Sequence, residues 1–367
     1  MRKIIQWIFS RPIRWIALKV SSAPRRDEIF NALSALYRNI SEKNSGGKIL
    51  PLYTTKGRYI IFSDQHKGTR DQADDFRWAE ENYMCALQYY YDQGYTLIIL
   101  GDAEELWENT PQAVIDKNRL NLLEEAKFLQ LNRYHRVYGN HDLEWKYQVP
   151  RFLYLKPIFG DKLSISEGLI LRGAVGGREL DIFMTHGHQG DRKSDGNAFS
   201  MWFVAAIWTP IQRFLNISIN TIADSFELVD KHNILMYEWS ATQKNMIFIS
   251  GHTHKPVFAS MDHIDRLGAE LQLAESLEQH EKVEGIREEI ERRKKEYAGK
   301  HLVKTMAVPS YFNTGCCCFV DGDITGIEIC DGEISLVKWK QSAEQPKPYR
   351  TLLERASLHY IASQLTS

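Results

Sequence analysis

Short apolar runs alternate with amphipathic stretches from about Arg58 onward. Residues 59–63 and 96–100 form mostly apolar runs that predict two buried strands, and residues 136–138 predict a third. Between these runs, apolar residues in 74–92 and 120–128 recur at helical spacing, so we expect a helix in each gap. This strand–helix–strand order predicts an α/β fold whose neighbouring strands run parallel.

The second half of the chain has a more sheet-like pattern. Residues 163–173 and 179–186 alternate between apolar and polar positions, and residues 245–250 form another apolar strand. Residues 303–339 contain several β-like runs separated by Asp-Gly turns, which predicts a hairpin-rich sheet that closes the domain.

The remaining segments predict flanks and insertions around a main domain at 56–340. A basic stretch with two tryptophans opens the chain, and residues 1–26 predict either a helix lying in an anionic membrane surface or an ordinary packed helix. No apolar run is long enough to span a bilayer. The segments are a basic amphipathic N-terminal segment at 1–50, an apolar helical lid at 190–242, a charged, solvated helical arm at 265–300 and a C-terminal amphipathic helix at 341–367.

Composition narrows the class of protein. The chain has 367 residues, is 43% hydrophobic and carries a net charge of −1, so it can bury a sizeable core and has no global field to recruit nucleic acid. No nucleic-acid partner is expected. Five cysteines, three of them consecutive at 316–318, make a poor disulfide framework and indicate a reducing, cytoplasmic compartment. We interpret the three as small residues of a buried strand rather than as a metal site.

Polar residues with metal-binding chemistry follow the predicted strands. Asp64 and Asp102 are 38 residues apart, and so are Asp102 and Asn140, and each gap fits one strand–helix–strand crossover. Because open α/β sheets place their ligands beyond the carboxyl ends of the strands, we expect these side chains to converge. The candidate metal ligands are Asp64, His66, Asp102, Asn140, His186, His252 and His254.

Such a ligand set suits two divalent ions. Two ions about 3.5–4 Å apart can generate a bridging hydroxide near neutral pH and direct it at phosphorus. Mixed nitrogen and oxygen ligands do not select among manganese, iron, zinc and cobalt. His141 follows Asn140 and is expected to face the substrate as a catalytic residue, with Asp142 orienting it.

The ordered motifs Asp-x-His, Gly-Asp, Gly-Asn-His-Asp, His and Gly-His-x-His resemble those of the calcineurin-like metallophosphoesterase superfamily. The resemblance covers about residues 56–262 and 300–340, and it implies a four-layer α-β-β-α sandwich with helical insertions. It also implies the ligand sets, with His141 catalytic and His188 either facing the substrate or lying behind the ligands. One metal would be held by Asp64, His66, Asp102 and His254, and the other by Asp102, Asn140, His186 and His252.

A further stretch points to one branch of that superfamily. The segment from Gly101 to Trp107 is similar to that of UDP-2,3-diacylglucosamine hydrolase, a pyrophosphatase with an apolar helical lid between its fourth and fifth motifs. The similarity makes Glu105 and Trp107 substrate-binding residues, and the alternative is a carboxylate behind the ligands and a packed indole. This chain departs from that enzyme at His141, where an arginine is common, and in its arm and N-terminus.

We therefore expect a metal-dependent phosphohydrolase, cytoplasmic or peripheral on the inner face of the membrane. Its substrate would be a phosphate or pyrophosphate ester, with a UDP-sugar lipid or another lipid-linked ester as the first candidate. Cyclic nucleotides, nucleotides and phosphoproteins are the alternatives. The cofactor would be two divalent ions, manganese first, with iron, zinc or cobalt as alternatives. A non-catalytic membrane scaffold is the hypothesis from another class, and the intact ligand set argues against it.

Overall fold

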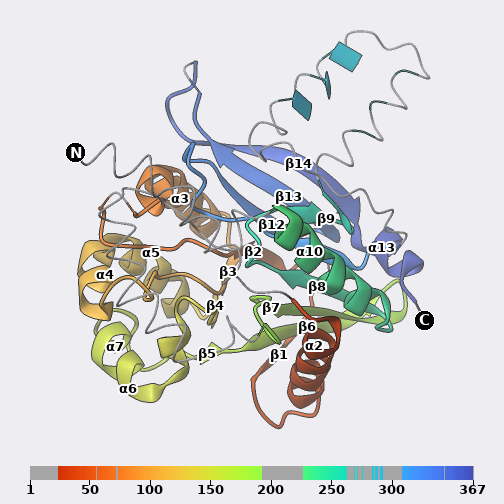
Figure 1. Cartoon of the computed structure of the whole chain (residues 1–367), viewed down its shortest axis with the longest axis horizontal. Coiled ribbons are helices and arrows are strands. Elements are labelled where there is room, and N and C mark those ends of the chain that lie inside the picture. Colours follow the sequence, from red (N-terminus) through yellow and green to blue (C-terminus); the bar gives the residue numbers. More distant parts are fainter. Residues whose placement is uncertain are drawn as a thin grey trace, which may run out of the picture.

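The structure is a computed structural model that describes two stacked β-sheets. The described residues are 24–191 without 55 and 72, 226–262, a few residues between 268 and 291, and 308–366 without 343. Within them, two seven-stranded sheets carry helices on their outer faces (Figure 1).

The first sheet holds the parallel strands that the sequence predicts. Its order is β14-β13-β12-β2-β3-β4-β5, and β2 through β5 pair in parallel, whereas β12, β13 and β14 add an antiparallel edge. The strands are β2 (Arg58–Phe62), β3 (Thr96–Leu100), β4 (Tyr134–Val137), β5 (Ile165–Ser166), β12 (Ile324–Cys330), β13 (Glu333–Lys340) and β14 (Tyr349–Ser357).

The second sheet has the order β1-β6-β7-β8-β11-β9-β10. At its centre β7, β8 and β11 run parallel, so the loops that follow β7 and β8 leave from the same edge. The strands are β1 (Gly47–Pro51), β6 (Gly168–Val175), β7 (Arg178–Thr185), β8 (Met246–Ser250), β9 (Val257–Phe258), β10 (Met261–Asp262) and β11 (Tyr311–Asn313).

Strand residues alternate between two buried faces. Ile60 and Phe62 of β2 pack into the cluster that contains the helices, whereas Ile61 between them packs into the cluster shared by both sheets. In β3, Leu97 likewise packs into the cluster that contains the helices, and Ile98 packs into the cluster shared by both sheets. Because both faces are buried, the strands carry uninterrupted apolar runs.

Helices cover both outer faces and complete four layers. Tyr83 and Leu122 belong to the cluster over the first sheet, and Leu33 and Trp239 belong to the cluster over the second. The predicted α-β-β-α sandwich is confirmed. The helices are α2 (Arg26–Ser41) and α10 (Phe226–Ala241) on the second sheet, α3 (Phe76–Asp92), α4 (Pro111–Lys117), α5 (Arg119–Gln130) and α7 (Lys156–Phe159) on the first, the short η1 (Leu143–Lys146), α6 (Gln148–Pro150) and η2 (Arg151–Leu155), and α13 (Leu358–Gln364).

The two ends of the chain differ from their predicted boundaries. In the segment expected at 1–50, α2 and β1 belong to the sandwich, and β1 pairs in parallel with β6. Residues 1–23 lie outside the described residues, so the membrane-surface helix stays a prediction. At the other end, β14 occupies 349–357, where a helix is expected, because pairing with β13 and the ion pair of Arg350 with Glu328 hold this stretch extended.

The two insertions are described only in part. Residues 192–225, with most of the predicted lid, lie outside the described residues, and the end of 190–242 is helix α10, packed on the second sheet. In the arm at 265–300, Ile286 and Ile290 bury against Leu271 and Val283, so the described residues fit a helical arm. None of the described helices is long and apolar enough to cross a membrane.

The consecutive cysteines are buried as predicted, but they lie in the loop after β11 rather than in a strand.

Candidate metal centre

Loops from both sheets bring the predicted ligands together. The loop after β2 hydrogen-bonds the loop after β3, since the backbone N–H groups of Asp64 and His66 donate to the carbonyls of Gly101 and Asp102 at 3.1 and 2.9 Å. On the other sheet, Gly251 N–H donates to the His186 carbonyl at 2.8 Å. Each loop therefore holds its neighbour in register at one edge of the sandwich.

Several of these residues have an unusual backbone conformation. Five of the candidate ligands have a positive φ, between 49° and 69°. Non-glycine residues rarely adopt this region, and such residues cluster at functional sites. These ligands lie two or four residues beyond the ends of β2, β3 and β8, and their side chains converge through tight turns. These five are Asp64, His66, Asp102, His252 and His254.

Two glycines of the motifs are required by close packing against the carboxylates. A methyl group on Gly139 would overlap the Asp102 carboxylate, and one on Gly251 would overlap Ser63 and the Asp64 carboxylate. The Gly-Asn and Gly-His pairs thus let two loops approach the carboxylates at van der Waals distance.

Asp64, His66 and His254 form the first group of candidate ligands, with ligand atoms within 4.8 Å of one another. His254 Nε2 lies 3.2 Å from Asp64 Oδ1, and His66 Nε2 lies 3.8 Å from the same oxygen. His66 Nδ1 is hydrogen-bonded to Glu105 at 2.8 Å, which leaves Nε2 for an ion.

Asp102, His186 and His252 form the second group within the same limit. His186 Nδ1 bonds the Leu100 carbonyl at 2.8 Å, and its Nε2 lies 3.0 Å from Asp102 Oδ2. The same Oδ2 lies 3.6 Å from His66 Nε2 of the first group. Asp102 therefore lies between the two groups, in the position of a bridging ligand.

The residues fit two metal ions. Asn140 Oδ1 and His252 Nε2 are buried atoms without a hydrogen-bond partner among the described residues. A buried polar atom without a partner is costly, and a cation would satisfy both. The donor set of carboxylate, amide and imidazole matches first-row divalent ions.

The pKa values of the candidate ligands also favour positive charge at this site. Burial alone would raise the pKa of the Asp64 and Asp102 carboxyls, but the charge of His186 and those of the other neighbouring histidines together outweigh it and hold both pKa values below their usual range. Burial would lower the pKa of His186, yet Asp102 and Asp64 raise it to about 9. The proton on His186 thus supplies positive charge that a bound ion would otherwise supply.

His141 is held at the edge of this cluster by Glu105 and Trp107. Its Nδ1 lies 2.9 Å from Glu105 Oε1, and the Trp107 ring stacks on the imidazole at 4.1 Å with an interplanar angle of 16°. Trp107 Nε1 also donates to the Asn140 carbonyl at 2.6 Å. Burial alone would raise the pKa of Glu105, but His141 and His66 lower it to about 2. Glu105 is therefore an ionised carboxylate that joins a candidate ligand to the candidate catalytic residue.

Asp142 does not face the His141 ring, and Glu105 takes the orienting position expected of it. The Asp142 carboxylate is fully buried and accepts hydrogen bonds from Gly139 N–H at 2.6 Å, Ala103 N–H at 3.1 Å and Arg136 at 3.2 Å. The backbone turn points this side chain beneath the loop, so its position supports the loop rather than the proton chemistry.

A buried ionic network lies behind these loops and has no signal in the motifs. Lys67 is fully buried and donates to Glu125 at 2.8 Å, and Arg136 bonds Glu104. Trp145 also donates to Glu104, at 2.7 Å. The network links the loops after β2, β3 and β4, and it holds three motifs in a fixed arrangement.

His188 and His232 line the second group from behind. His188 is buried, its ring centroid lies 5.5 Å from that of His186, and burial together with the His186 charge lowers its pKa to about 3. His232 Nε2 bonds the Gly187 carbonyl at 2.8 Å, with its ring 5.1 Å from that of His252. Sequence reasoning missed His232, because a single histidine inside a long insertion carries no spacing signal.

Comparisons with known proteins agree with this geometry at the level of the family. The calcineurin-like phosphoesterase family model matches residues 57–256, more than half of the chain. No curated protein matches the chain. Structural neighbours include a Vps29 single mutant from Entamoeba histolytica (14% identity, 81% of this chain and 99% of that chain covered, TM-score 0.30). A second neighbour is a dimetal phosphatase from Danio rerio (8% identity, 82% of this chain and 100% of that chain covered, TM-score 0.36). A third is a mutant cold-active protein tyrosine phosphatase (12% identity, 83% of each chain covered, TM-score 0.31). TM-scores this low carry no conclusion, whereas the family match does. The chain belongs to the calcineurin-like phosphoesterase family.

Proposed function

We propose that this metal-dependent phosphoesterase holds two divalent ions with Asp64, His66, Asp102, Asn140, His186, His252 and His254, and that the centre hydrolyses a phosphate or pyrophosphate ester. The observation that carries the proposal is the pair of buried ligand groups with Asp102 between them. Only two of the seven side chains are carboxylates, so two dications would leave excess positive charge for a phosphate.

When bound, the ions would supply Lewis acidity to the reacting phosphate. His141 acts on the other side of the substrate. Because ionised Glu105 accepts from Nδ1–H, Nε2 of His141 is left for the substrate, and in the imidazolium form Nε2–H can donate a proton to the leaving-group oxygen or a hydrogen bond to a phosphoryl oxygen. Trp107 fixes the plane of the imidazole by stacking. Manganese is our proposed metal, with iron, zinc or cobalt as alternatives for the same donor set.

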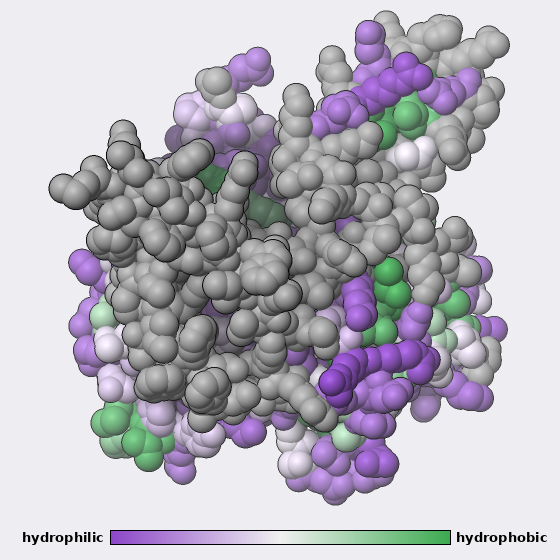
Figure 2. Space-filling view, viewed as in Figure 1, coloured by the Kyte–Doolittle hydropathy of each residue, from purple (hydrophilic) through white to green (hydrophobic). Residues whose placement is uncertain are grey.

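An exposed apolar patch supports a lipid-linked substrate. Tyr147, Val149, Phe152 and Leu153 are 55–67% exposed, directly after the loop that carries His141. In Figure 2 green side chains gather over the region of α6 and α7, with polar side chains beside them. Lys156 lies 4.8 Å from the Phe152 ring centroid. Exposed apolar side chains mixed with lysine suit a membrane interface with anionic lipid.

We therefore propose a UDP-sugar lipid or another lipid-linked phosphoester as the substrate, reached from the surface of a membrane on its cytoplasmic side. The stretch from Gly101 to Trp107 supports this branch by its similarity to UDP-2,3-diacylglucosamine hydrolase. The basic side chains of residues 1–26 would add electrostatic attraction to an anionic membrane surface. Cyclic nucleotides, nucleotides and phosphopeptides are the competing substrates.

Two assays test these proposals. Manganese-loaded protein should cleave an aryl phosphate monoester or diester, and Asp102→Ala and His141→Ala should abolish this turnover. Full activity in Asp102→Ala would contradict the bridging role. The substrate class is tested by presenting UDP-linked lipids, cyclic nucleotides and phosphopeptides to the same preparation. A preference for a water-soluble nucleotide would refute the lipid proposal and leave the metal centre intact.

A further inference from the structure

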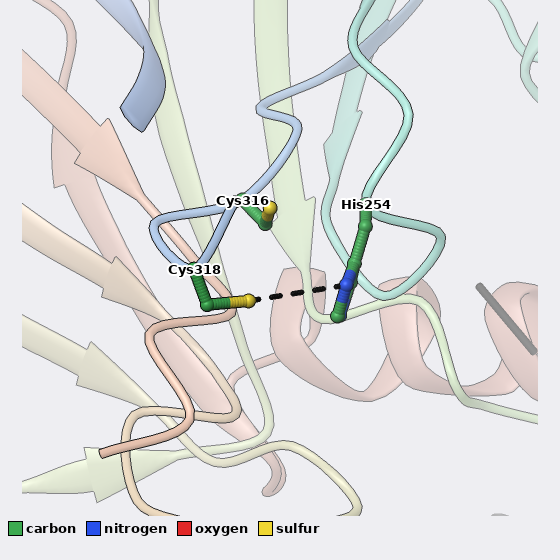
Figure 3. Close-up of side chains that lie close together, drawn as sticks. All are labelled: His254, Cys316 and Cys318. Carbon is green, nitrogen blue, oxygen red and sulfur yellow. Dashed lines mark hydrogen bonds between the residues drawn. The ribbon is translucent and has the colours of Figure 1, made fainter. Parts of the chain in front are cut away.

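Two of the three consecutive cysteines lie beside the metal centre, and the third does not. Cys317 belongs to the core over the first sheet, and its Sγ lies 3.8 Å from the Thr325 carbonyl. Cys316 and Cys318 instead have their sulfur atoms within 4.8 Å of each other and of a His254 ring nitrogen. Figure 3 shows the Cys318 sulfur directed at the His254 imidazole, with Cys316 next to Cys318 on the same loop.

The fold delivers these three side chains from neighbouring strands. β11 pairs in parallel with β8, and Asn313 lies opposite Ser250 in that register. The loop after β8 carries His254, and the loop after β11 carries Cys316 and Cys318. The cluster therefore depends on the strand pairing of the sandwich rather than on sequence proximity.

His254 faces different groups with its two ring nitrogens. Its Nε2 lies 3.2 Å from Asp64 Oδ1 in the carboxylate–histidine centre, and its Nδ1 lies 4.0 Å from Cys318 Sγ. The ring can therefore bind an ion at either nitrogen, and it binds ions at both nitrogens only as the imidazolate, after the ring N–H proton is released.

We propose that His254, Cys316 and Cys318 form a separate site for a thiophilic metal ion of the zinc class, next to the proposed hydrolytic centre. Two cysteine sulfurs and one imidazole select soft or borderline ions over magnesium or manganese. A divalent ion with two thiolates is neutral overall, so it satisfies buried sulfur ligands at little electrostatic cost.

The dimensions and the access both fit such an ion. The ligands of a tetrahedral zinc ion, about 2.3 Å away for sulfur and 2.0 Å for nitrogen, lie roughly 3.5–3.8 Å apart. The three atoms here lie within 4.8 Å, so small side-chain rotations would close them around the ion. Cys316 and Cys318 are buried, but the His254 side chain is 14% exposed and offers a way in.

The test uses the full chain, reduced and freed of metal by a chelator, then titrated with Co²⁺. Thiolate-bound cobalt absorbs strongly in the near ultraviolet through sulfur-to-metal charge transfer, which oxygen and nitrogen ligands do not produce. We expect one equivalent of cobalt with this absorption, and its complete loss when Zn²⁺ is added in excess.

Matched variants locate the site and separate it from hydrolysis. Cys316→Ser and Cys318→Ser should each lose the charge-transfer band. Cys317→Ala should keep it, because that thiol packs in the core on the opposite side. Asp102→Ala should also keep it while losing hydrolysis, so the proposed function and this site can fail independently.

Two results would overturn the proposal. One is a wild-type cobalt complex without the sulfur band, and the other is an undiminished band in both Cys316→Ser and Cys318→Ser. If circular dichroism shows that these variants do not fold, alkylation of the wild-type protein tests the site instead. Zn²⁺ should then protect Cys316 and Cys318 from alkylation, measured by peptide mass spectrometry, and equal labelling with and without Zn²⁺ refutes the site.

Discussion

Replacing Glu105 with glutamine tests how the centre is held. The Glu105 carboxylate is 12% exposed and bonds His66 Nδ1 at 2.8 Å and His141 Nδ1 at 2.9 Å. A glutamine has the same shape but a single acceptor oxygen, and its NH₂ group would face a ring N–H. At most one of the two histidines can therefore keep its partner.

The expected size of the effect follows from these two contacts. A hydrogen bond to a charged group contributes about 1.5–3 kcal/mol, which corresponds to roughly 10–150-fold in rate or affinity. Loss of partners behind metal ligands costs about 10–100-fold in metal affinity or activity. We expect Glu105→Gln to lower kcat about 10–100-fold and to weaken binding at the His66 site about tenfold.

The assay compares kcat on an aryl phosphate at saturating manganese with manganese affinity from calorimetry. Glu124→Gln is the matched control, because Glu124 pairs with Lys127 on the surface of α5, at 2.6 Å, and lies away from both ligand groups. It should leave both quantities unchanged. Wild-type kcat and wild-type metal affinity in Glu105→Gln would refute the positioning role.

Three further predictions follow from the loops and their charges. Gly139→Ala should displace the Asp102 carboxylate and abolish metal uptake, measured by elemental analysis of the folded protein; a full metal complement would contradict it. Arg136→Met should lower the free energy of unfolding by about 3–5 kcal/mol in urea denaturation, because the buried Glu104 and Asp142 carboxylates would both lose the guanidinium that pairs with them, and a loss below about 1 kcal/mol would contradict it. The raised His186 pKa of about 9 means that metal must displace a proton at neutral pH, so metal affinity should rise with pH up to that value. Calorimetry in buffers of different ionisation enthalpy should detect released protons, and an affinity independent of pH would refute this assignment.

Much of the first sheet is predictable from sequence, for a physical reason. β2 and β3 are buried on both faces, so their apolar runs are unbroken, and equal spacing of Asp64, Asp102 and Asn140 reports the repeated crossover. The ligand motifs are informative because parallel strands bring their carboxyl ends to one edge.

Other features depend on tertiary contacts that sequence patterns do not encode. The stretch 349–357 has enough apolar and charged residues to fit a helix, and pairing with β13 makes it a strand. Asp142 follows His141 directly, yet the turn buries its carboxylate against Gly139 and Arg136. The three adjacent cysteines look equivalent in sequence. The conformation of the loop after β11 places Cys317 in the core over the first sheet and Cys316 and Cys318 beside His254.

Anomalous diffraction from crystals of the manganese-loaded protein tests the central claim most directly. Two manganese peaks about 3.5–4 Å apart, one near Asp64, His66 and His254 and the other near His186, His252 and Asn140, with Asp102 touching both, is the predicted result. A single peak, or manganese bound away from these side chains, would contradict a paired-ion centre.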